Sequence, residues 1–138
     1  MQNNYNKLIN NLNNLSLTKF SSNLYSYISL INNGEKSLID SLYELTQLEI
    51  DVKNERAMNA CVRVANFPFL KSFDDFDFSF QPSINKDYIT NFQYLSFLKN
   101  KENIIFIGTP GVGKTHLATS IGIEAAKQRT STYFISCA

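Results

Sequence analysis

The 138-residue sequence lacks several features on which common functional classes depend. It has no tryptophan, one histidine and two cysteines, Cys61 and Cys137, which lie far apart and form no Cys-x-x-Cys pair. Metal and redox roles for these cysteines therefore have little support. No apolar run reaches the roughly 18 residues that a membrane span needs, and residues 1–15 lack the apolar core of a secretion signal. We expect a cytoplasmic protein that does not associate with a membrane.

Charged residues of both signs are also few, at 18% of the chain. The formal net charge is +1, whereas proteins that bind nucleic acid usually present a clustered basic face. One predicted helical stretch contains three basic residues, Lys53, Arg56 and Arg63. The acidic residues Asp51 and Glu55 lie among them. We interpret this stretch as a solvated helix face, with a phosphate-binding stripe as the alternative.

Glycine is scarce as well, yet three of the five glycines fall in the single stretch "GTPGVGKT", residues 108–115. This stretch fits the pattern G-x-x-x-x-G-K-[ST] at every fixed position. The apolar run "NIIFIG" before it is typical of a buried parallel strand, and "KTHLATSIGIEAAKQ" after it predicts a helix. The order strand, glycine-rich turn and helix predicts a phosphate-binding loop, and a chance glycine turn is the alternative.

The residue types in this loop suit nucleotide chemistry. Glycines let successive backbone N–H groups approach a phosphate, and the first turn of the following helix offers further unpaired N–H groups. Lys114 would face the β and γ phosphates, and the Thr115 hydroxyl would ligate Mg²⁺. The predicted nucleotide-binding residues are Gly108, Thr109, Pro110, Gly111, Val112, Gly113, Lys114 and Thr115.

Residues 1–65 are predicted to form a helical N-terminal region. Apolar residues recur there at helical spacing in two short stripes, and a longer helix is predicted from Leu38 toward Arg63. Ser37 and Asp40 resemble a capping box at the start of that helix. The stripes are interpreted as the core of a small bundle, with a partner-binding surface as the alternative. Their members are Tyr5, Leu8, Leu12 and Leu15, followed by Phe20, Leu24, Tyr27 and Ile31.

Residues 66–102 are predicted to form an aromatic linker and a helix. Phe76, Phe78 and Phe80 alternate with polar residues, which indicates an extended segment with three rings on one side. We favour a linker held onto the nucleotide-binding region by its rings, and an aromatic wall near an adenine base is the alternative. One helix is then predicted across residues 84–98, capped by Ser83 or Asn85.

These stretches together resemble a known family. The segments "RVANFP", "FDFSFQPSI" and "ENIIFIGTPGVGKTHLATSIGIEAAK" closely resemble the IstB-like ATP-binding proteins, transposition helpers related to the DnaC helicase loaders. The resemblance covers residues 38–138 well and the first helices more loosely. The aromatic stretch combined with "GKTHLA" is far more selective than the loop alone.

The resemblance implies an AAA+ ATPase that binds ATP and Mg²⁺, self-assembles on DNA and works with a transposase. It implies an α/β fold in which the helical region precedes a parallel sheet, with residues 103–138 forming strand, loop, helix and a second strand, after which the sheet is truncated. Only the loop residues carry over from the family's site. His116 fits the family pattern but is interpreted as structural or exposed.

A residue needed for phosphoryl transfer is missing from the pattern. No apolar strand ending in Asp or Glu follows the loop, so no catalytic residue is assigned and the chain alone is not expected to hydrolyse ATP. We interpret the chain as the N-terminal portion of an IstB-like ATPase. The alternatives are a non-enzymatic helical interaction module with a vestigial loop and a helicase-loader-like ATPase.

Overall fold

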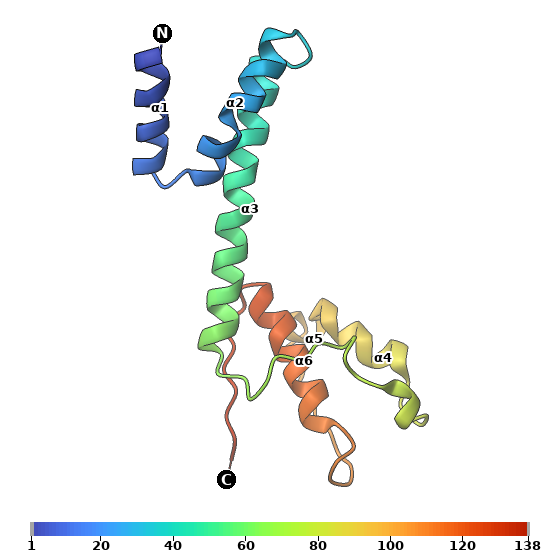
Figure 1. The fold of residues 1–138 in the computed structure, drawn as a ribbon. Coiled ribbons are helices and arrows are strands. Elements are labelled where there is room, and N and C mark those ends of the chain that lie inside the picture. The colour runs from blue at the N-terminus through green and yellow to red at the C-terminus, as the bar shows by residue number, and fades with distance from the viewer. Residues whose placement is uncertain (1, 138) are drawn as a thin grey trace. The chain divides into compact units, whose positions relative to one another are not determined.

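The computed structural model describes residues 2–137 and divides the chain into two compact units, one ending at Arg56 and the other beginning at Ala57. Figure 1 shows the order of the helices along the chain. None of the helices in the described residues is long and apolar enough to cross a membrane. The helices are α1 (Gln2–Asn14), α2 (Thr18–Asn32), α3 (Leu38–Val64), α4 (Lys86–Thr90), α5 (Ser96–Lys99) and α6 (Lys114–Lys127), with short 3-10 helices η1 (Phe78–Phe80) and η2 (Asn91–Tyr94).

The N-terminal unit is organised around three buried leucines, one from each of its helices. Leu12 of α1, Leu24 of α2 and Leu45 of α3 form the centre of the cluster, and Leu45 is only 1% exposed. Leu12, Leu24 and three of the partly buried neighbours belong to the stripes predicted from the sequence, whereas Leu8 and Leu15 of the first stripe are exposed. The partly buried neighbours are Tyr5, Ile9, Leu17, Phe20, Tyr27, Ile28 and Leu48.

Polar contacts fix the start of α3 in this unit. The Ser37 hydroxyl oxygen accepts the Asp40 N–H at 3.0 Å, which confirms Ser37 as the cap. The Asp40 carboxylate accepts from the Ser37 hydroxyl at 2.6 Å, a different bond from the reciprocal one to a backbone N–H in a capping box. One turn further along the helix, Glu44 accepts hydrogen bonds from Tyr27 of α2 at 2.9 Å and from Lys36 at 2.5 Å. These contacts join the first turns of α3 to α2.

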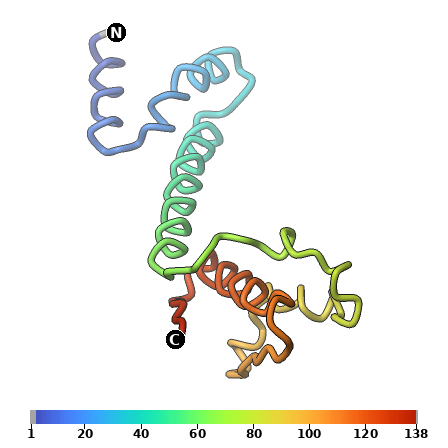
Figure 2. Tube along the Cα trace, turned by 60° about the horizontal axis from the view of Figure 1, so that its bottom comes forward, coloured from blue at the N-terminus to red at the C-terminus, as the bar shows by residue number. Residues whose placement is uncertain are grey.

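The C-terminal unit is built around α6. Leu117, Ile121 and Ala125 recur along one face of α6 and are buried with Phe73, Ile89 and Leu95. The linker that leaves α3 lies against another face of α6, because a Cβ at Gly122 would meet the ring of Phe67 at 2.6 Å. Figure 2 shows this linker leaving α3 and passing beside α6.

The predicted α/β fold class, with a parallel sheet truncated after its second strand, is wrong: residues 2–137 contain helices and no strand. Residues 103–107 form no regular secondary structure, with Ile104 and Phe106 against the core of this unit and Ile105 and Ile107 exposed. The described part of the segment after α6 that the sequence predicts as the second strand does not pair with residues 103–107. Its Phe134 N–H donates instead to the carbonyl of Ala65 at 2.8 Å. A strand needs a ladder of such bonds to a neighbour, and an apolar run in the sequence does not by itself supply one.

Two predictions for the linker region are also wrong in detail. Residues 78–80 form a 3-10 turn instead of an extended segment, so Phe80 is 71% exposed while Phe76 and Phe78 pack against the core. The single helix predicted across residues 84–98 is broken into α4, η2 and α5. Leu95 adopts a left-handed φ of 56° at the break and is buried there. Asn85 is the cap, accepting the Tyr88 N–H at 3.0 Å.

Candidate functional site

The loop before α6 is closed around the side chain of Lys114. Its Nζ donates to the carbonyl oxygen of Gly108 at 2.8 Å and to that of Thr109 at 2.7 Å. A lysine ammonium has three donors, so these two bonds hold the positive charge at the loop and leave one donor for an anion.

The loop leads directly into the amino end of α6. Gly113 is the residue before the helix, with φ 92° and ψ 17°, and no side chain caps the helix end. Gly111 also has a positive φ, of 81°. The first N–H groups of a helix lack partners within it and carry the positive end of its dipole. The open end of α6, two left-handed glycines and the Lys114 ammonium together suit a phosphate group.

An aromatic ring supports the loop from the linker. A Cβ at Gly113 would lie 2.5 Å from Cε2 of Phe76, so the ring packs directly against the glycine backbone. Phe76 also meets the rings of Phe78 and His116 edge-on, at centroid distances of 4.7 and 5.2 Å. Phe76 and Phe78 therefore hold the linker onto this unit, as the sequence interpretation favoured.

Two polar side chains of α6 bind the same linker. Nε2 of His116 donates to the carbonyl of Ser72 at 2.9 Å, which requires the proton on that nitrogen because a carbonyl oxygen can only accept. One turn later the Ser120 hydroxyl lies 3.0 Å from the carbonyl of Lys71. His116, interpreted from the sequence as structural or exposed, is half-buried and contacts the linker. Sequence reasoning missed the pair, although polar residues at i and i+4 on a largely apolar helix were a visible signal.

The aspartates near the loop are engaged in turns. The carboxylate of Asp75 accepts the Ser72 N–H at 2.8 Å, and this bond holds its pKa below the ordinary value. Asp77 accepts from the hydroxyl and the N–H of Ser79, which lowers its pKa likewise. Residues 2–137 contain no group of three or more His, Cys, Asp or Glu side chains that could hold a metal ion.

The predicted site residues form one continuous feature. Residues 108–113 make the turn, and Lys114 and Thr115 begin α6. Thr115 is exposed at the open helix end. One hydroxyl suits Mg²⁺ only as part of a larger oxygen set, because this ion usually takes most of its ligands from substrate phosphates and water. The N–H groups and the Lys114 ammonium therefore suit a phosphate. The single Thr115 hydroxyl suits a cation only when that cation is already bound to the phosphate.

Comparison with known proteins extends this result beyond the loop. A family model described as "IstB-like ATP binding protein" matches residues 10–138. A protein of insertion sequence IS232 from Bacillus thuringiensis subsp. berliner, named for ATP binding, is 50% identical over 99% of this chain and 55% of its own length. A similarly named protein of insertion sequence IS5376 from Geobacillus stearothermophilus is 43% identical over 72% of this chain and 40% of its own length.

A third relative belongs to insertion sequence IS21 of Pseudomonas aeruginosa and is 39% identical over 57% of this chain and 30% of its own length. The chain thus spans about half the length, or less, of these relatives. The family match includes both the helical N-terminal residues and the glycine loop. The resemblance inferred from the sequence is confirmed, and the chain belongs to the family of IstB-like ATP-binding proteins.

Proposed function

We propose that this chain binds ATP with Mg²⁺ through residues 108–115 and acts, within a protein of its relatives' length, as a helper ATPase for a transposase on DNA in the cytoplasm. The observation that carries the proposal is the position of Lys114. Its ammonium is held by the carbonyls of Gly108 and Thr109 at the uncapped end of α6. The relatives' names, which combine ATP binding with insertion sequences, support both halves of the proposal.

Four residues of the loop have distinct roles in nucleotide binding. Gly111 and Gly113 allow the left-handed turns that aim backbone N–H groups at a phosphate. Lys114 turns its free donor to the β and γ phosphates, and Thr115 supplies one oxygen to the cation. Bound Mg²⁺ would neutralise part of the phosphate charge. We assign no residue of this chain to the chemical step.

The proposal is tested by titrating the 138-residue chain with fluorescent ATP in the presence of Mg²⁺. Lys114→Ala should weaken binding at least tenfold, because it removes the only side-chain cation of the motif. Lys99→Ala, an exposed lysine in the last turn of α5, is the matched control and should bind as the parent chain does. Equal affinity of the Lys114 variant and the parent would refute the assignment.

A further inference from the structure

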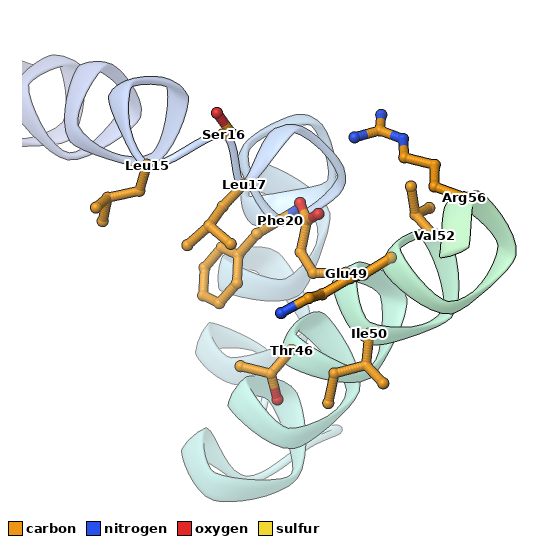
Figure 3. Close-up of a pocket in the computed structure, with 10 residues that line it drawn as sticks. Leu15, Ser16, Leu17, Phe20, Thr46, Glu49, Ile50, Val52 and Arg56 are labelled. Carbon is orange, nitrogen blue, oxygen red and sulfur yellow. The ribbon is translucent and has the colours of Figure 1, made fainter. Parts of the chain in front are cut away.

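A groove in the N-terminal unit is unrelated to the glycine loop. It has a volume of about 510 Å³ and lies where the turn between α1 and α2 faces the middle of α3. Figure 3 shows its lining side chains. Five of them are apolar, which makes the floor a surface for aliphatic or aromatic groups: Leu15, Leu17, Phe20, Ile50 and Val52.

The groove leaves apolar surface uncovered. Leu15 is 68% exposed and Ile50 is 47% exposed, although both face the same concavity. Single exposed leucines are common on protein surfaces and mean little. Apolar side chains gathered in one hollow with a charged edge are instead typical of a site that binds a partner.

The charges of the groove do not cancel. Glu49 Oε1 accepts the Phe20 N–H at 2.8 Å, so its carboxylate lies at the amino end of α2, where the helix dipole compensates it. Lys53 and Arg56 line the groove on α3, and neither has an ion pair with another described residue. Figure 3 shows the Glu49 carboxylate turned toward Phe20 and Arg56 at the groove's edge. The groove lining therefore carries one carboxylate and two cations without an ion pair, a net charge of +1.

An apolar floor beside two cations favours some binding partners over others. Nucleic acid would satisfy Lys53 and Arg56 but would leave the apolar floor without a partner. A second copy of the chain has a formal net charge of +1 and gives no overall electrostatic match. An amphipathic helix with acidic residues beside its apolar stripe satisfies both the floor and the edge.

We propose that the groove formed by Leu15, Leu17, Phe20, Ile50 and Val52 binds an acidic amphipathic helix of a partner protein, with Lys53 and Arg56 pairing with its carboxylates. The floor supplies affinity through apolar burial, and the two cations set the charge preference and the orientation of the helix. This docking function is independent of the glycine loop.

The test uses the full 138-residue chain and two labelled helical peptides of about four turns. Both carry leucines at i, i+3, i+4 and i+7, flanked by glutamates in one peptide and by lysines in the other. The acidic peptide should bind at least tenfold more tightly in fluorescence anisotropy. Ile50→Asp should abolish this binding, and the double change Lys53→Glu and Arg56→Glu should reverse the preference between the peptides.

Matched controls separate docking from general effects. Ile39→Asp changes an apolar residue of α3 outside the groove that is 73% exposed, and Lys7→Glu changes a cation of α1 outside it; both should bind as the parent chain does. Circular dichroism checks that each variant is folded. If Ile50→Asp is unfolded, the peptide preference of the double variant Lys53→Glu and Arg56→Glu provides the test. Equal binding of both peptides, absence of binding, competition by DNA, or self-association abolished by Ile50→Asp would each overturn the proposal.

Discussion

The ring of Phe76 packs so closely against Gly113 that a Cβ at residue 113 would lie 2.5 Å from its Cε2 atom. Gly113 also has a φ of 92°, which side chains disfavour. The aromatic linker and the glycine loop are therefore mechanically connected at the residue where α6 begins. Any movement of Phe76 changes the support of the backbone that precedes Lys114.

Replacing Gly113 by Ala should cost more than replacing Gly111 by Ala. Both glycines have positive φ, and a side chain there costs about 1–2 kcal/mol. Only Gly113 adds a collision, because a Cβ at Gly111 meets nothing within 4 Å. Chemical denaturation of the two variants measures the difference, and equal free energies of unfolding would contradict the contact with Phe76.

Replacing Phe76 by Leu should weaken ATP binding without unfolding the chain. Leucine keeps apolar volume but loses the flat ring that fills the space beside Gly113, so the loop should become less ordered. We expect an affinity at least fivefold lower. Phe80→Leu is the control, since Phe80 is 71% exposed and should leave binding unchanged. Equal loss in both variants would show that the effect is not specific to the loop.

Much of the local structure could be predicted from the sequence because its causes are local. The helical spacing of Leu12 and Leu24, the Ser37 cap and the helix after the glycine loop all depend on residues close in the chain. The family followed from short segments in a fixed order. The glycine loop was visible because its residue types at fixed spacing have few structural alternatives.

The absence of a sheet from residues 2–137 could not be predicted, because whether an apolar segment becomes a strand depends on partners distant in sequence. Residues 103–107 have the alternating burial of a strand, yet alternation records only that one side faces a core. The Leu95 turn and the contact of Phe76 with Gly113 were equally hidden. Phe76 and Gly113 are far apart in sequence, and leucine is not a residue type that favours a left-handed φ.

The N-terminal unit should lose stability in acid through Glu44. Hydrogen bonds from Lys36 and then Tyr27 lower the pKa of Glu44 in the folded chain. A carboxylate with a lowered folded pKa stabilises the fold above its unfolded pKa, and this contribution disappears as pH falls through the folded value. Thermal midpoints should therefore decline below about pH 5, and less so in Glu44→Gln. Glu55→Gln, an exposed change elsewhere on α3, should decline as the parent does.

If residues 108–115 hold the phosphates of a nucleotide, the amide chemical shifts of the loop should report it. Titrating the ¹⁵N-labelled chain with ATP and Mg²⁺ should move the amide signals of Gly111, Gly113 and Lys114 most, because their N–H groups lie in the loop and at the open end of α6. Adenosine, which has no phosphate, should leave these signals in place. Shifts that concentrate outside residues 108–115, or that adenosine reproduces, would show that this loop does not hold the phosphates.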